Sequence, residues 1–401
     1  MSSDVSQISK AWVDHHVKST DSGFQYDALS QETSFRLLKL LPASDTSSPI
    51  ICTMSEERID DSSLKYAALS YTWGSTQDKK EIILNSRPAL ITQNLHMALQ
   101  HIRHMTGLLG NILQPLPLWI DALSINQQDE TEKAMQIGHM YQIFANAQPV
   151  VAWLGLEGDG SDMIMDAIKQ GNSVDVASIP APALLSFLNR PWWTRAWVLQ
   201  ECMAAGSLMW LVCGSSYTSF ITVFPFVNKV LMYIDRQSYY IQRTALREVL
   251  SSRWHFFIHL EKYEKEQVFP LYDIIKLSSK LEATDSRDKV FALLGLVDDQ
   301  TTSQIRPDYT LSPCEIFCKA IRVMAQDKER SAIVLEKLKD FDSIGSRGHR
   351  PLVENVYERQ KCDGVACSSK SLCFNLPTWA SGSVSDLVDY FIMGLQNPGT
   401  V

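Results

Sequence analysis

The sequence lacks the features of a secreted or membrane-spanning protein. Its first ten residues, Met1–Lys10, are polar, so they do not form a secretory signal peptide. No Asn-x-Ser/Thr sequon occurs, and no apolar run approaches the roughly 18 residues that a transmembrane helix requires. The eight cysteines are scattered along the chain, which fits free thiols in a reducing compartment. We therefore expect a cytoplasmic protein without a membrane span.

Positive charge and ligand-binding motifs are also scarce. The chain has 37 basic and 45 acidic side chains and a net charge of -8, and basic clusters such as Lys79–Lys80 are too short to indicate the positive surface that binding to a nucleic-acid duplex needs. It contains neither a Gly-rich phosphate loop nor a serine nucleophile elbow. The cysteines Cys362, Cys367 and Cys373 lie further apart than most paired ligands of structural zinc. We expect no metal site and no bound cofactor.

What remains is an ordinary globular composition with a surplus of tryptophan. Hydrophobic residues make up 45% and charged residues 20%, which excludes disordered, collagen-like and coiled-coil chains. A length of 401 residues favours two or three domains. Seven of the ten tryptophans lie between Trp73 and Trp210. This clustering indicates that one part of the chain forms a distinct, aromatic-rich unit.

Short apolar runs alternate with helical patterns in that part of the chain. The runs Tyr66–Tyr71, Leu116–Ile120 and Pro149–Leu154 are each followed by polar residues or glycine, as is typical of buried strands in a parallel sheet. The stretches Asn94–Met105 and Thr131–Ala147 have helical periodicity and separate them. The alternation predicts an α/β layer architecture with right-handed crossovers.

The flanking segments are less regular. Phe35–Leu41 is predicted to be a strand, whereas Pro42–Ser63 is rich in Ser, Asp and Pro and is predicted to be mostly loop. Trp192–Ala205 is predicted to be one helix that Gly206 caps. The pattern beyond Ser219 is mostly helical.

These patterns define three expected parts of the chain. Residues 1–60 are predicted to be a partly flexible lead-in, residues 61–215 an α/β domain, and residues 216–401 a mainly helical region. The chain stops at Val401 without a clear terminal element, so we expect a truncated end.

Three motifs carry a family resemblance. They are Ala68–Gly74 (ALSYTWG), Leu118–Gln127 (LWIDALSINQ) and Arg190–Glu201 (RPWWTRAWVLQE). Their residues, order and spacing resemble the fungal heterokaryon incompatibility (HET) domain. The match is strong over Tyr66–Gly214 and looser over Asp285–Ala380.

The chain departs from the usual family pattern at two places. Ser124 stands where the family usually has cysteine, so a thiol there is not essential in this protein. Lys133 replaces a usual arginine and keeps the charge but not the planar fork. The neighbouring Glu130 and Glu132 are predicted to be first-turn charges that the helix dipole favours.

The resemblance implies a role in non-self recognition and programmed cell death in filamentous fungi, together with an unknown incompatibility partner protein. HET domains are in turn similar to TIR domains, some of which cleave NAD and some of which form homo-oligomers. The implied fold is a TIR-like or flavodoxin-like parallel sheet flanked by helices, followed by a mainly helical region. NAD would then be a substrate rather than a bound cofactor.

On this resemblance, Glu201 matches the glutamate that is catalytic in NAD-cleaving TIR domains, because Trp197–Glu201 has the same spacing. A continuous helix would place Trp193, Trp197 and Glu201 on nearly one face, with no basic residue among the helical neighbours of Glu201. Aromatic walls would raise the pKa of this carboxyl, as in many catalytic sites. The alternative is a structural carboxylate that accepts hydrogen bonds.

The residues that follow the first buried strand are the best candidates for a nucleotide pocket. Ser70, Tyr71, Trp73 and Gly74 lie at its carboxyl end, where open α/β sheets bind ligands. Gly74 would allow close approach of the ligand, and Ser70 would donate a hydrogen bond. Alternatively, Trp73 fills the core and Gly74 only forms a turn.

Two further charged residues have open roles. Asp121 ends the second strand and is expected either to bind a ribose hydroxyl or to cap a loop. Arg195 is predicted to lie on the opposite side of the helix from Glu201, and we favour a helix-packing ion pair over phosphate binding or pairing with Asp121. The competing hypothesis for the whole domain is a non-catalytic signalling module that self-associates through tryptophan-rich surface.

Overall fold

The computed structural model describes residues 23–326, except 44, 46, 106–110, 112, 114–115, 236–244, 247–248, 251–253 and 255–267. The chain divides into two compact units, residues 1–264 and 265–401. The start of the predicted lead-in and the cysteines Cys362, Cys367 and Cys373 lie outside the described residues. The expected domain boundaries at residues 60 and 215 stay a prediction.

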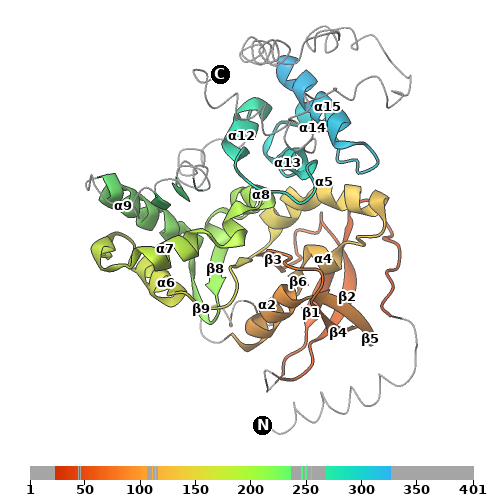
Figure 1. The fold of residues 1–401 in the computed structure, drawn as a ribbon. Helices are drawn as coiled ribbons and strands as arrows, with labels where there is room; N and C mark the ends of the chain where they lie inside the picture. Colours follow the sequence, from red (N-terminus) through yellow and green to blue (C-terminus); the bar gives the residue numbers. More distant parts are fainter. Residues whose placement is uncertain are drawn as a thin grey trace. The chain divides into compact units, whose positions relative to one another are not determined.

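The first unit is built on a mixed sheet of nine strands within its described residues, in the order β5-β4-β2-β1-β6-β3-β7-β8-β9 (Figure 1). The strands are β1 (Ser34–Leu40), β2 (Ile51–Arg58), β3 (Ala67–Tyr71), β4 (Lys79–Leu84), β5 (Arg87–Thr92), β6 (Leu118–Trp119), β7 (Val150–Trp153), β8 (Met209–Cys213) and β9 (Ser216–Ser219). The central strands β6, β3, β7 and β8 are parallel, while β1 and β9 flank them in antiparallel pairing.

The central strands are buried along almost their whole length, because both of their faces are apolar. Every residue of β3 and of β7 is buried, and Ser70 and Tyr71 pair with Ala152 and Trp153. This burial confirms the three predicted strands and the α/β class. Since these strands run parallel, their carboxyl ends meet at one edge of the sheet.

Helices cover both faces of the sheet. They are α2 (Gln93–His104), α4 (Asp121–Ser124), α5 (Glu130–Asn146), α6 (Ser161–Gln170), α7 (Ala181–Leu188), α8 (Trp197–Ala205) and α9 (Val223–Asp235). Leu95 and Leu99 of α2 share a core with Leu69 and Tyr71 of β3. Ser70 points to the opposite face, as alternation along a strand requires, and contacts Glu201 of α8.

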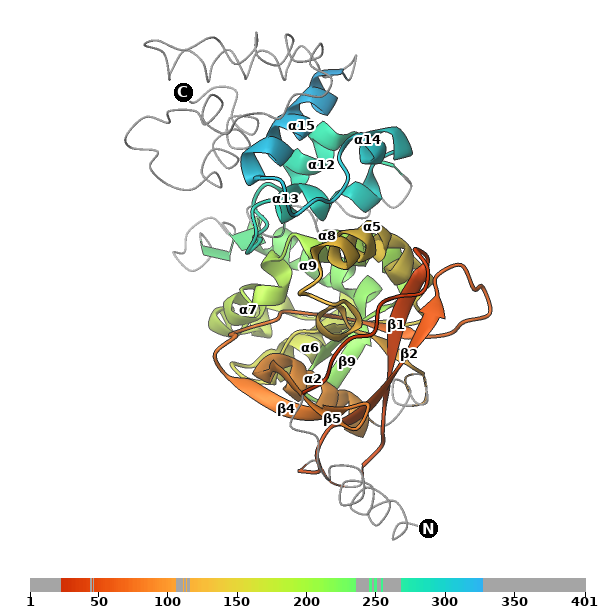
Figure 2. The ribbon, with the colours of Figure 1, turned by 90° about the vertical axis from the view of Figure 1, so that its right-hand side faces the viewer.

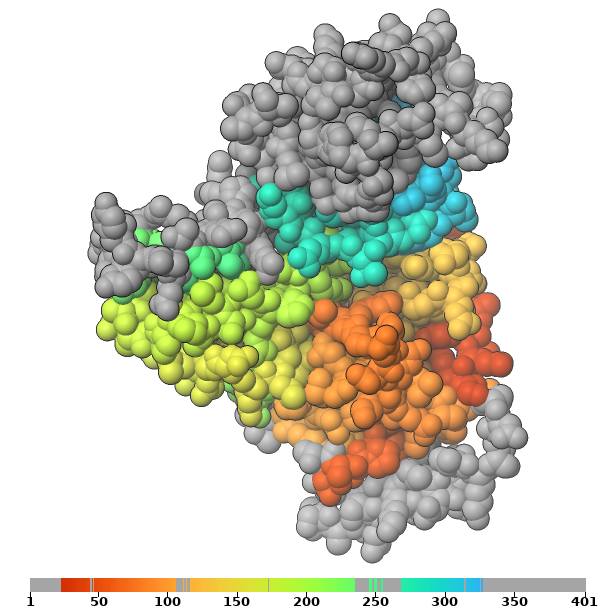
Figure 3. Space-filling view, in the orientation of Figure 1, coloured from red at the N-terminus to blue at the C-terminus, as the bar shows by residue number. Residues whose placement is uncertain are grey.

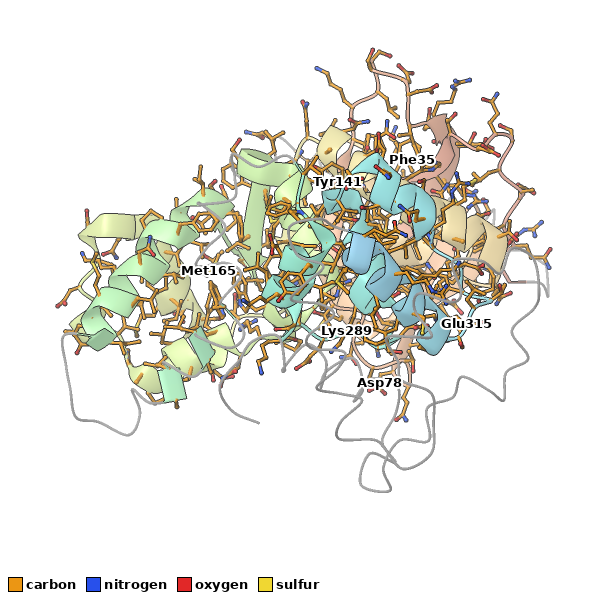
Figure 4. All side chains as sticks on the ribbon, turned by 90° about the horizontal axis from the view of Figure 1, so that it is seen from above. Phe35, Asp78, Tyr141, Met165, Lys289 and Glu315 are labelled. Atoms are coloured by element: carbon orange, nitrogen blue, oxygen red, sulfur yellow. The ribbon has the colours of Figure 1, made fainter. Side chains whose placement is uncertain are left out.

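Figures 2 to 4 show how several of these helices and strands are arranged. Helix α5 lies beside α8, and β1 runs along β2 (Figure 2). The outer side of α2 forms part of the orange surface of Figure 3. The apolar stripe of α6 includes Met165, which is fully buried and lies among the side chains of the green helices (Figure 4).

The structure tests two predictions for the segment that precedes the central strands. The predicted strand at Phe35–Leu41 is confirmed as β1. The prediction that Pro42–Ser63 is mostly loop holds for the described residues outside β2 but misses that strand, whose residues Cys52–Arg58 pair with β1. The outer half of β2 is exposed and therefore polar, which hid the strand in the sequence.

The predicted helix Trp192–Ala205 is also wrong as one continuous element. A 3-10 turn, η3 (Pro191–Thr194), comes first, the backbone is extended at Arg195, and α8 begins at Trp197. Trp192 and Trp193 are almost fully buried, and their packing overrides the local helical pattern. Trp193 and Glu201 therefore do not share one helix. Gly206 adopts φ +51° and caps α8, as predicted.

The described part of the second unit is helical. It contains α12 (Leu271–Ser278), α13 (Asp288–Phe291), the 3-10 turn η6 (Leu294–Leu296), α14 (Asp299–Gln304) and α15 (Pro313–Gln326). Glu315, labelled in Figure 4, accepts hydrogen bonds from the backbone N–H and the hydroxyl of Ser312 at the start of α15. None of the helices that the structure describes in either unit is long and apolar enough to cross a bilayer.

Candidate functional site

The candidate residues converge on the edge of the sheet where β3 and β6 end. Ser70 and Tyr71 are the last residues of β3, and Asp121, the first residue of α4, follows shortly after β6. Glu201 reaches the same place from α8 and contacts Ser70. The structure thus brings together residues that are 131 positions apart in the chain.

Glu201 is the buried centre of this cluster. Its residue exposure is 2% and that of Ser70 is 1%. The Ser70 hydroxyl donates to Glu201 Oε2, and Trp192 Nε1 donates to Ser70 Oγ at 2.7 Å. The carboxylate therefore has a neutral hydrogen-bond donor on one oxygen, held in turn by an indole.

Arg195 lies on the same side as Glu201, so the prediction that the two residues point apart is wrong. Its Nη1 is 3.7 Å from Glu201 Oε1, an ion pair that is longer than a hydrogen bond. The break in the helix before α8 turns the Arg195 side chain back toward Glu201. None of the helical neighbours of Glu201 is basic, as expected, but the ion partner Arg195 comes from the extended residue before α8.

Trp73 lies at the exposed rim of the cluster. Its exposed fraction is 38%, and its Nε1 donates to Asp121 Oδ2 at 2.7 Å. The alternative that Trp73 fills the core is therefore wrong. Asp121 also accepts a hydrogen bond from the backbone N–H of Ala122 at 2.7 Å, so it caps the loop and holds the indole at once.

The loop after β3 is fixed by a residue that sequence reasoning missed. Asn94 Nδ2 donates to the carbonyl oxygen of Thr72 at 2.5 Å, and its Oδ1 accepts from Trp153 Nε1 at 3.1 Å. Gly74 adopts φ +76°, a conformation that glycine reaches at little cost. In the sequence, Asn94 is one more polar residue at a helix start, and nothing there signals its contact with Thr72.

Burial dominates the electrostatics of the two carboxylates. It raises the pKa of Glu201, against the opposing effects of Arg195 and the Ser70 hydrogen bond, and the charge of Asp121 raises it further. Burial likewise raises the pKa of Asp121, against Arg195 and the Trp73 hydrogen bond. One guanidinium thus faces two carboxyls, and the effect of burial on the pKa of each carboxyl outweighs that of the guanidinium charge.

Trp197 and Glu201 are four residues apart on α8, so the two side chains leave the same face of this helix. Trp197 is half-buried. This aromatic residue therefore remains a candidate wall for a planar ligand beside the carboxylate.

A second buried network supports the loop that carries Asp121. Arg36 Nη1 and Nη2 donate to the two oxygens of Glu132 at 2.6 and 2.9 Å, and Arg36 Nη1 also donates to the carbonyl oxygen of Ser124 at 3.1 Å. The backbone N–H of Asn126 donates to Glu132 Oε1 at 2.7 Å. Glu132 is therefore more than the first-turn charge that the sequence predicted. In the sequence, Arg36 within the apolar strand β1 could have indicated that a buried acidic partner exists.

A metal site and a surface cleft are the two other kinds of ligand site to consider. Among the described residues, no group of His, Cys, Asp and Glu side chains could hold a metal ion. An open cleft of about 590 Å³ is lined by Glu157, Lys169, Ser215, Ser216 and Tyr217. None of the predicted site residues lines this cleft.

Comparisons with known proteins agree with the three sequence motifs. Residues 66–201 match the family model described as Heterokaryon incompatibility protein (HET). The chain is 29% identical over 402 residues to the Heterokaryon incompatibility protein 6, OR allele, of Neurospora crassa. This similarity covers 82% of the chain and 58% of the relative, so the chain spans little more than half of that protein's length. No solved structure matches the chain significantly.

Proposed function

We propose that this chain, a HET-domain protein whose HET domain spans residues 66–201, acts in fungal heterokaryon incompatibility and programmed cell death. The name of the Neurospora relative supports the incompatibility role. The family motifs Ala68–Gly74, Leu118–Gln127 and Arg190–Glu201 all supply residues of the cluster at the end of β3. That cluster is where we locate the activity.

We further propose that the cluster hydrolyses NAD in a TIR-like reaction. The observation that supports this most directly is Glu201, a buried carboxylate with a raised pKa, held by Ser70 where β3 ends. The bond between nicotinamide and ribose C1′ would break, and nicotinamide would leave with the electron pair. Ionised Glu201 would stabilise the ribosyl cation until water adds its oxygen to C1′ and releases a proton.

The rim residues would bind the remainder of the substrate. Asp121 would accept a hydrogen bond from a ribose hydroxyl, and Trp73 and Trp197 would stack on the nicotinamide ring. Because Glu201 is only 2% exposed, the proposal requires the contact between Trp73 and Asp121 to open before the substrate enters. Gly74 lies directly beside Trp73 and supplies backbone freedom at that position.

The test in cells compares NAD content after induced expression of the wild type, Glu201→Gln and Glu130→Gln. Glu130 is an exposed glutamate outside the cluster and serves as the matched control. We expect NAD depletion and cell death with the wild type and the control, and neither with Glu201→Gln. Death of cells that keep their NAD would overturn the enzymatic proposal and leave the incompatibility role standing.

A second candidate function is a non-catalytic module that signals by self-association. The observation that favours it is the enclosure of Glu201, which is bonded to Ser70 and paired with Arg195. On this alternative, Glu201→Gln would remain toxic. Light scattering of the purified protein would show a homo-oligomer, and surface variants that dissociate it would lose toxicity.

A further inference from the structure

The side chain next to Ser70 in the buried cluster is an indole whose hydrogen-bonding role is fixed by its chemistry. Trp192 belongs to η3 rather than to α8, and its exposed fraction is 1%. An indole N–H can only donate a hydrogen bond. At 2.7 Å from Trp192 Nε1, Ser70 Oγ must therefore act as the acceptor.

This constraint sets the direction of the serine proton. A serine hydroxyl has one proton and two lone pairs, and one lone pair of Ser70 already accepts from Trp192. The Ser70 proton is then directed to the neighbouring oxygen, Glu201 Oε2. Without the indole, the hydroxyl would be free to rotate toward other partners.

We propose that Trp192 and Ser70 are positioning residues that fix the orientation of the Glu201 carboxylate through the chain Trp192 Nε1–H, Ser70 Oγ–H, Glu201 Oε2. This chain leaves the other oxygen, Oε1, on the side of Arg195. The inference deepens the proposed NAD hydrolysis and rests on it for its catalytic consequence, while the orientation of the carboxylate can be measured without any substrate.

Four charged or titratable groups among the described residues interact electrostatically with Glu201. They are Arg195 before α8, Asp121 on α4, Tyr71 on β3 and Cys202 on α8 itself. Substitution of Trp192 or Ser70 leaves all four in place. Because the Ser70 hydrogen bond lowers the pKa of Glu201, loss of the chain will raise that pKa.

The structure offers a closely matched control. Trp193 is the next residue of the same turn and is equally buried, but its Nε1 donates to the backbone carbonyl of Phe187 at 3.1 Å. Trp193→Phe therefore removes an indole N–H at the same depth that is not part of the chain to Glu201, and it keeps an aromatic ring against Trp192. Ser70→Ala is the second test variant, because it removes the middle group with little loss of volume.

The experiment measures two quantities on the full chain: the titration of the Glu201 carboxyl carbon by NMR, and the kcat for nicotinamide release from NAD. We expect Trp192→Phe and Ser70→Ala to raise the pKa of Glu201. We also expect them to lower kcat by about 10- to 100-fold, with little change in KM, because they misplace a reacting group. Trp193→Phe should match the wild type in both quantities.

Identical titrations for the wild type, Trp192→Phe and Ser70→Ala would overturn the proposal. So would a Trp193→Phe variant that shifts the titration as much as Trp192→Phe. Circular dichroism shows whether each variant is folded, and Ser70→Ala decides the question if Trp192→Phe does not fold. A wild type that leaves NAD intact refutes the proposed function alone, and the titration then decides the role of Trp192 and Ser70.

Discussion

Two buried glutamates of the first unit differ in how their charge is compensated. Glu132 receives two short hydrogen bonds from one arginine, Arg36, and a third from a backbone N–H. Glu201 has an arginine 3.7 Å away and a neutral serine as its hydrogen-bond donor. The first arrangement gives a buried carboxylate three hydrogen-bond donors, two of them charged, whereas the second leaves a carboxyl whose pKa burial raises.

On the proposed function, this difference separates a structural ion pair from a catalytic carboxyl. The Arg36–Glu132 pair joins β1 to α5 and holds the loop after Asp121. The Glu201 cluster joins α8 to β3 without satisfying the carboxylate as fully. Buried carboxyls with raised pKa values are typical of catalytic sites, which is why we propose that the chemistry takes place at Glu201.

The largest expected effect is the loss of stability when the ion pair between Arg36 and Glu132 is broken. Arg36→Met leaves the Glu132 charge buried without its partner, and we expect a loss of about 3–5 kcal/mol in the free energy of unfolding. Urea unfolding followed by circular dichroism measures it. The double variant Arg36→Met/Glu132→Leu should recover most of the loss, because it removes the unpaired charge. A double variant as unstable as the single one would contradict this account of the pair.

The second effect is a pH dependence at Glu201. Because its folded-state pKa is raised, the stability that its protonation contributes is present below the unfolded pKa and is lost as the pH rises through the folded pKa. Glu201→Gln stays neutral throughout, so its unfolding free energy should rise relative to the wild type as the pH rises above the unfolded glutamate pKa of about 4.3. A difference between the two proteins that does not change with pH would refute the raised pKa. Glu130→Gln, an exposed Glu-to-Gln substitution outside the cluster, is measured in parallel as the control.

The smallest effect concerns the rim of the site. Trp73→Phe removes the hydrogen bond to Asp121, and we expect a loss of about 1 kcal/mol in unfolding free energy. Because that hydrogen bond lowers the pKa of Asp121, the same variant should raise it, which an NMR titration of Asp121 can detect. An unchanged Asp121 titration would show that Trp73 does not hold this carboxylate in solution.

The sequence predicted the centre of the sheet better than its margins. The runs that became β3, β6 and β7 are apolar on both faces, and such strands are recognisable without any tertiary information. The strand β2 was missed because its exposed half reads as a polar loop. Whether a half-exposed, polar segment forms a strand depends on the strand that pairs with it. The local sequence pattern does not show which segments pair.

The candidate site shows the same limit. Family motifs pointed to Ser70, Asp121 and Glu201, and the structure brings all three to one edge of the sheet. The position of Arg195 could not be predicted, because the break between η3 and α8 comes from the packing of two tryptophans. The pairing of Arg36 with Glu132 spans 96 residues and leaves no local pattern.

The measurement that tests the central claim most directly is nicotinamide release from NAD by the purified protein. The account predicts release by the wild type and by Glu130→Gln, and a rate lower by about 10²- to 10³-fold for a folded Glu201→Gln. Equal rates for the wild type and Glu201→Gln, or no release by a folded wild type, would contradict the claim that Glu201 is the catalytic carboxylate.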